Sequence, residues 1–257
     1  MQTHFTFQIL KQMKYTLYII LITLVTSFRV FSQETVLSPI NNPAIKNLVL
    51  SETSEMNWFM LQDTLKVQIG KVKTEIQKRK ENIYIITTVD MVHSPAKWID
   101  STVVGTQNFA PKYHSSYNQQ RDMVLKFGEK ITGYYLDKKT EMKTEISEEA
   151  ETSFFDSNFY PQFIRFLPLK NGYSNTISIF DYNPKAEIGL ITATIKNTEE
   201  TTLNFNEKKR SVWKVETTDD ISNNSAVSTY YIDTTTRKIL KQEIDFGGRK
   251  MVMELVE

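Results

Sequence analysis

The chain has 257 residues, of which 40% are hydrophobic, 24% charged and 12% aromatic, as in ordinary folded globular proteins. It contains no cysteine, which excludes disulfides, thiolate metal sites and an N-terminal cysteine modified by lipid. The net charge of +1 comes without a basic block, so the composition gives no electrostatic reason to expect nucleic-acid binding.

Residues 1–33 have the pattern of an export signal. Lys11 and Lys14 precede an apolar run from Tyr15 to Phe28, and Ser32 is a suitable small residue for cleavage. The run is shorter than the roughly 20 residues of a membrane-spanning helix; an uncleaved N-terminal anchor is the alternative. We therefore expect a periplasmic or otherwise exported envelope protein, with no transmembrane segment after cleavage.

Residues 34–54 are polar and contain Pro39 and Pro43, so we expect a polar leader or an edge segment there. From Leu65 onward, apolar and polar residues alternate, the pattern of half-buried strands. Strands are expected at residues 65–76, 83–89, 98–104, 110–117, 123–127 and 131–136. The charge-rich stretch 137–151 is expected to be a solvated hairpin.

One aromatic segment, residues 153–169, interrupts the strand pattern. Asp156 or Ser157 could cap a short helix there, with Pro161 in its first turn and Pro168 ending it. Phe159, Phe163 and Phe166 are spaced by four and three residues, so we expect them to share one face. Such a helix could plug the end of a sheet or form a lid over an apolar cavity.

The strand pattern resumes after Gly172 and continues to the C-terminus. Strands are expected at residues 176–182, 187–196, 201–205, 211–217, 227–233, 239–245 and 250–256. The prediction is a mainly β protein, in which a single domain over residues 55–257 forms a large, curled antiparallel sheet, a half-barrel with one or two short helices.

The usual catalytic patterns are missing. His93 and His114 are not spaced as zinc ligands, and we expect both in loops or at strand edges. Ser94 and Lys97 match a Ser-x-x-Lys nucleophile motif, but Pro95 indicates a loop, so we interpret the match as coincidence.

Carboxylates offer no clearer pattern. Asp181 and the pair Asp219 and Asp220 are explained by turn capping. We predict no catalytic residue, no metal site and no cofactor, and therefore a protein that is not an enzyme, although a hydrolase with an unfamiliar constellation stays open.

Residues 155–257 resemble an uncharacterised family of bacterial envelope proteins related to the lipoprotein carriers (LolA/LolB-like). The resemblance is carried by Phe163–Lys170 with Gly172, by Val212–Val215, and by Tyr230–Asp233 followed by Arg237–Leu240. It implies a sheet curled around an apolar cavity that holds acyl chains, with short helices at its mouth.

The leading hypothesis is therefore a non-enzymatic envelope protein that binds an apolar or amphipathic ligand, such as a lipid, inside the sheet. Its predicted ligand-binding residues are the aromatic residues of the helical segment: Phe155, Phe159, Tyr160, Phe163 and Phe166. The alternative is a structural or assembly module that docks an envelope protein and has no ligand cavity.

Overall fold

The computed structural model describes residues 36–63, 65–184 and 189–256. The predicted export signal, residues 1–33, lies outside them. In the described part, fifteen strands belong to one sheet, accompanied by one short helix and three 3-10 turns, which confirms the predicted fold class.

The first half of the sheet consists of β1 (Glu52–Gln62), β2 (Leu65–Arg79), β3 (Asn82–Met91), β4 (Trp98–Gly105), β5 (Pro111–Tyr117), β6 (Arg121–Phe127), β7 (Ile131–Asp137) and β8 (Met142–Glu148). The second half consists of β9 (Phe155–Asp156), β10 (Asn175–Asp181), β11 (Gly189–Phe205), β12 (Lys208–Asp219), β13 (Ala226–Asp233), β14 (Ile239–Phe246) and β15 (Arg249–Val256). Between β9 and β10 lie the helix α2 (Tyr160–Phe163) and the 3-10 turn η2 (Ile164–Phe166).

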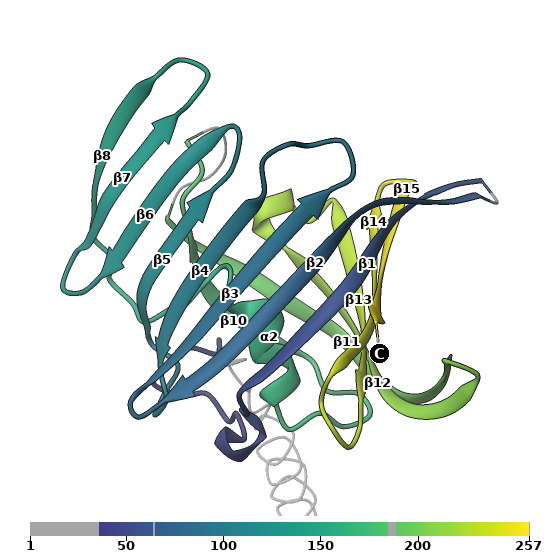
Figure 1. Cartoon of the computed structure of the whole chain (residues 1–257). Helices are drawn as coiled ribbons and strands as arrows, with labels where there is room; N and C mark the ends of the chain where they lie inside the picture. Colours follow the sequence, from purple (N-terminus) through teal and green to yellow (C-terminus); the bar gives the residue numbers. More distant parts are fainter. Residues whose placement is uncertain (1–35, 64, 185–188, 257) are drawn as a thin grey trace, which may run out of the picture. The chain divides into compact units, whose positions relative to one another are not determined.

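The sheet is two meanders joined in the middle. The spatial order runs from β8 down to β1, then from β15 down to β9 (Figure 1). All neighbours are antiparallel except β9 and β10, and β1 pairs with β15 through a continuous register from Glu55↔Val256 to Leu61↔Lys250. The first and last described strands therefore form the central seam.

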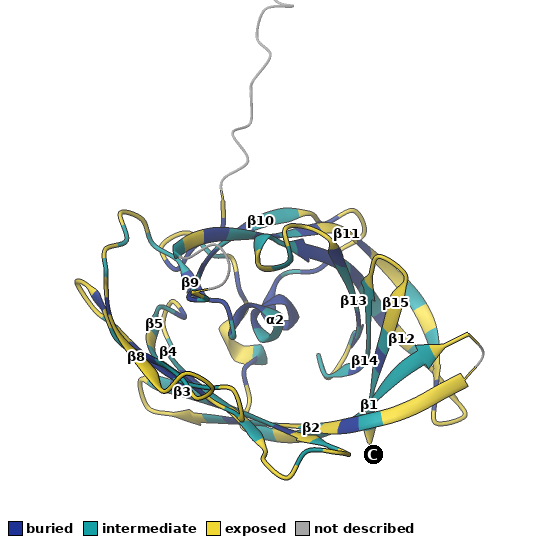
Figure 2. Cartoon of the chain, turned by 90° about the horizontal axis from the view of Figure 1, so that it is seen from above, coloured by how far each residue is buried: buried dark blue, intermediate teal, exposed yellow. Residues whose placement is uncertain are grey.

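The sheet curls so that α2 lies on its concave face (Figure 2). Phe109, in the β4–β5 connection, lies at the centre of this core, with its ring centroid 5.6 Å from Phe159, 5.9 Å from Phe163 and 6.3 Å from Phe166. The expectation that the three helical-segment phenylalanines share a face is confirmed. The same core includes Ile85 of β3. The side of β3 that carries Ile85 therefore belongs to the concave face of the sheet.

The two ends of the sheet are joined by side chains rather than by strand pairing. Phe180 of β10 contacts Phe127 of β6 and Phe154, with centroid distances of 6.1 and 5.3 Å. Tyr182, just after β10, contacts Tyr135 of β7 at 6.2 Å. These rings pack together with the buried side chains of Met123, Leu125, Ile131 and Ile146. Apolar contacts between side chains therefore join the two ends of the strand order.

The segments around α2 are held by arginines. Arg165 of η2 forms an ion pair with Glu52 of β1, and its Nε donates to the carbonyl oxygen of Arg237. Arg237 donates in return to the carbonyl oxygens of Arg165 and Leu167 at 3.4 and 3.3 Å. Two of the sequence stretches that carry the family resemblance therefore contact each other directly.

The predicted leader is attached to the domain in its described part, residues 36–51. Leu37 pairs with Ile177 of β10 in a parallel bridge, and Ile45 donates from its backbone to Phe166 at 2.7 Å. Val49 is buried in the main core.

Three elements differ from expectation. Strand β1 was not predicted, because Trp58, Phe59 and Met60 follow one another without polar alternation. The predicted strands 187–196 and 201–205 are one strand, β11, in which a register shift at Ile195/Asn197 breaks the period. The helix has no side-chain cap, although Pro161 lies in its first turn. Asp156, one of the two predicted caps, is hydrogen-bonded to Thr102 and His114 instead.

Replacing Phe163 with alanine tests the core around Phe109. The side chain has no exposed surface and contacts three other rings. We expect Phe163→Ala to lower the free energy of unfolding by about 3–5 kcal/mol, since it leaves a cavity. Leu65→Ala, at a side chain that is 65% exposed, is the control and should change it by less than about 0.5 kcal/mol in denaturant titrations.

Candidate functional site

A polar cluster lies on the concave face, next to the aromatic core. Ile85 of β3 belongs to that core, and the registers Ile85↔Thr102 and Thr102↔His114 place these residues on the same face. Because side chains alternate along a strand, Asp100 and Ser116 share this face too. The cluster therefore arises from two neighbouring strands, β4 and β5, that present polar residues where a core is expected.

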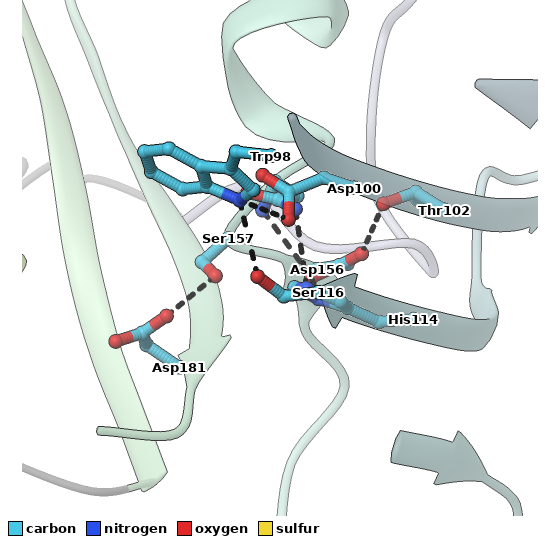
Figure 3. Close-up of polar contacts among 9 residues, drawn as sticks. Trp98, Asp100, Thr102, His114, Ser116, Asp156, Ser157 and Asp181 are labelled. Carbon is cyan, nitrogen blue, oxygen red and sulfur yellow. Dashed lines mark hydrogen bonds and ion pairs between the residues drawn. The ribbon is translucent and has the colours of Figure 1, made fainter. Parts of the chain in front are cut away.

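Asp156 is the centre of this cluster (Figure 3). It has no exposed surface, and its Oδ2 accepts a hydrogen bond from Thr102 Oγ1 at 2.8 Å. Its Oδ1 lies 2.8 Å from His114 Nδ1 and accepts from the backbone N–H of Asn158 at 3.2 Å. A buried carboxylate is tolerated only when it is paired in this way, so strand β9 is anchored to β4 and β5 through one side chain.

His114 is held on both sides of its ring. Its Nε2 lies 3.1 Å from Asn158 Nδ2, so a neutral ring with its proton on Nδ1 satisfies both contacts. Burial, the largest single effect, lowers the pKa of His114, but the charge and hydrogen bond of Asp156 raise it. Asp100 and Asp181 add to the increase, and the net result is a pKa above 6.5.

Two further hydrogen-bonded groups flank the cluster (Figure 3). The indole Nε1 of Trp98 lies 2.7 Å from Asp100 Oδ1 and 3.2 Å from Ser116 Oγ. Ser157 Oγ donates to Asp181 Oδ1 at 2.7 Å. Burial raises the pKa of Asp181, against the lowering effect of the Ser157 hydrogen bond.

Two sequence-based interpretations are corrected here. His114 is neither in a loop nor at a strand edge; it is 3% exposed in the middle of β5. Asp181 does not cap a turn; it ends β10 and accepts from Ser157. Neither partner is near in sequence, so spacing gave no signal. The predicted loop is confirmed, since Ser94 and Lys97 lie in the β3–β4 connection.

Turn capping is confirmed at Asp219, which accepts from the backbone N–H of Ser222 at 3.1 Å. It is wrong for Asp220, which accepts instead from the backbone N–H of Thr192 on β11 at 2.8 Å. Asp219 has an additional role, since it accepts a hydrogen bond from the hydroxyl of Tyr160. Burial raises the pKa of that tyrosine well above its usual value.

Beside the polar cluster is a pocket of about 730 Å³, which we call the mouth pocket. It lies where the β3–β4 and β5–β6 connections link the ends of their strands. Its apolar lining consists of Val67, Ile69, Met91, Ala96, Trp98 and Tyr135. Its polar lining consists of Gln68, His93, Ser94, Asn118, Gln119, Gln120, Arg121 and Asn183. Trp98 belongs both to this lining and to the polar cluster, so it joins the two.

The five residues predicted to bind a ligand lie in the closed core. Phe155, Phe159 and Phe163 have no exposed surface, Phe166 is 1% exposed and Tyr160 is 5% exposed. The structure brings them together around Phe109, and none of them lines the mouth pocket. Sequence reasoning missed that pocket, because its lining comes from five separate segments.

The described residues offer no metal centre, since they contain no group of three or more His, Asp or Glu side chains placed to hold an ion. None of the helices in these same segments is long and apolar enough to cross a bilayer.

Removing the central carboxylate tests the structural role of the cluster. Asp156→Ala leaves His114 and Thr102 without their shared partner in a buried site. We expect the free energy of unfolding to fall by about 3–5 kcal/mol in chemical denaturation. The control is Glu149→Ala, at an exposed carboxylate that pairs with Lys130, for which we expect less than about 1 kcal/mol. Equal effects would contradict the anchoring role.

The histidine gives the fold a pH dependence. Because its pKa is raised in the folded state, the stability it contributes is full below pH 6.5 and is lost as the pH rises through the folded-state value. Burial also raises the pKa of Asp181, so the stability that this carboxyl contributes is likewise lost with rising pH, starting above pH 3.8. We expect the free energy of unfolding to fall as the pH rises above 6.5, less steeply in His114→Gln. His93→Gln, at the exposed loop histidine, should keep the wild-type slope.

Comparison with known proteins is consistent with this architecture. Residues 53–254 match the model of a family described as a protein of unknown function (DUF3108). The crystal structure of a beta-barrel-like protein of domain of unknown function DUF1849 from Brucella abortus is similar in fold, with a TM-score of 0.50 at 11% identity. That match covers 81% of this chain and 97% of the other.

No curated protein matches the chain. The comparisons confirm the coarser part of the expected resemblance, an uncharacterised family with a β-barrel-like fold. Because the family model spans most of the described strands, from β1 to β15, the chain belongs to the DUF3108 family of proteins of unknown function.

Proposed function

We propose that the protein is exported to the cell envelope and binds an apolar or amphipathic small molecule, such as a lipid, in the mouth pocket. The observation that carries this proposal is the pocket itself, whose volume of about 730 Å³ lies in the range of small-molecule sites. Its lining combines apolar side chains with convergent polar groups, as such sites do.

The ligand is assigned to the mouth pocket rather than to the phenylalanines of the helical segment. Those side chains already fill the space around Phe109, and an acyl chain among them would have to displace packed rings. In the mouth pocket, Val67, Ile69 and Met91 offer apolar surface that is open to a ligand. Each CH₂ buried there contributes about 0.8 kcal/mol.

The resemblance to lipoprotein carriers supports the same class of ligand. In that picture the curled sheet supplies a concave face, and the short helix fills one part of it while the open part holds the apolar cargo. We therefore keep the carrier-like function but place the ligand in the mouth pocket, beside Trp98 and Tyr135.

The proposal includes no catalytic step. Among the described residues, His114 and Asp156 resemble an acid–base dyad, but the pair is buried and both nitrogens of the histidine ring are already hydrogen-bonded. Its contacts account for the anchoring of β9, which is a sufficient reason for these residues to be present.

A second candidate function is the docking of a partner protein. Strand β8 (Met142–Glu148) ends the sheet and pairs only with β7 among the described strands. Such an edge can accept a further strand, although Lys143 and Glu145 are charged residues of the kind that discourage pairing.

Binding of the neutral fluorophore N-phenyl-1-naphthylamine to the full-length chain, purified from the envelope fraction of expressing cells, tests the first candidate. We expect saturable binding that Ala96→Trp weakens by about tenfold or more, because the indole fills the pocket. Val92→Trp, at an exposed position of the same connection outside the lining, is the matched control and should bind normally.

Either of two results would count against the ligand-binding function. Absence of saturable binding, with no lipid in native mass spectra of the purified protein, would favour partner docking. Equal binding by Ala96→Trp and the wild type would show that the fluorophore lies outside the mouth pocket.

A further inference from the structure

Arg121 introduces a positive charge into the mouth pocket. It is the first residue of β6, and the register Ser116↔Met123 places Met123 on the concave face. Arg121 is two residues away on the same strand and therefore shares that face. Its side chain is half-buried and belongs to the lining of the pocket.

The guanidinium has an unused donor. The backbone of Arg121 is paired with Asn118, through its N–H to Oδ1 at 3.0 Å and through its carbonyl oxygen to the N–H of Asn118 at 3.0 Å. Its side-chain Nε, by contrast, is buried and has no hydrogen-bond partner among the described residues. A buried donor without an acceptor costs free energy, and an arginine carries its charge at every physiological pH.

Among the described residues, no carboxylate forms an ion pair with this guanidinium. Asp137 lies opposite Arg121 in the β6–β7 register, and its Oδ1 accepts from the backbone N–H groups of Lys139 and Thr140. The described lining of the pocket contains no aspartate or glutamate. Asp122, the next residue, pairs with Lys138 at 2.6 Å. Asp181 lies close enough for Arg121 to lower its pKa, but burial raises that pKa by more and Ser157 occupies one of its oxygens.

We infer that the mouth pocket selects an anionic amphiphile, whose carboxylate or phosphate group binds the Arg121 guanidinium while its apolar part lies against Val67, Ile69 and Met91. An arginine presents a planar fork of donors that fits either anion. This inference rests on the proposed function, which it deepens by naming the class of ligand.

The test uses ligands that share one chain and differ in the head group. Dodecanoate, dodecyl phosphate, dodecanol and dodecyltrimethylammonium compete with N-phenyl-1-naphthylamine for the full-length protein, each below its critical micelle concentration. We expect the anions to bind at least about tenfold more tightly than the alcohol, as for a hydrogen bond to a charged group. The two anions together distinguish a carboxylate from a phosphate ligand.

Arg121→Gln then isolates the guanidinium. We expect the variant to bind dodecanoate and dodecanol with equal affinity, while its affinity for dodecanol stays at the wild-type value. Arg79→Gln is the matched control, because Arg79 is exposed at the opposite end of β2 and should leave the anion preference intact. Arg121→Lys keeps the charge and should retain part of the preference, which gives a second measurement should Arg121→Gln fold poorly.

The outcomes separate the two levels of the proposal. Binding of all four ligands with equal affinity, or tighter binding of the cation, overturns the role of Arg121 and leaves the apolar-ligand function in place. Displacement of the fluorophore by none of them overturns the ligand-binding function itself.

Discussion

A carboxylate without exposed surface has to be paired, and the arrangement of this sheet depends on how Asp156 meets that requirement. Asp156 belongs to β9, the strand at one end of the spatial order, whereas its partners Thr102 and His114 belong to β4 and β5 in the other meander. The pairing therefore draws one end of the sheet across the concave face. It acts together with the aromatic contacts of Phe180 and Tyr182, which also join the two meanders.

This constraint divides the concave face into regions of different chemistry. Around Phe109 the face is filled by packed aromatic rings. The polar cluster is also closed, because its donors and acceptors satisfy one another. Beyond Trp98 the face opens to the mouth pocket.

The sequence predicted the fold class, most strands and the shared face of Phe159, Phe163 and Phe166, because all of these depend on local periodicity. It did not predict β1, whose middle is continuously apolar, or the continuity of β11 across its bulge. The sequence did not predict the polar cluster either, for a different reason. Asp156 and His114 are 42 positions apart, and only the curling of the sheet makes them neighbours.

The seam between β1 and β15 has a consequence for how this sheet can assemble. Apart from the parallel β9–β10 pair, each meander can form from hairpins between successive strands. The seam joins the first and last described strands, so it can close only when both meanders exist. Until then β1 and β15 are both open edges, and unpaired edges recruit other chains. The strand edges most exposed to aggregation during folding are therefore those of β1 and β15, which end up in the middle of the finished sheet, and not the outer edges of β8 and β9.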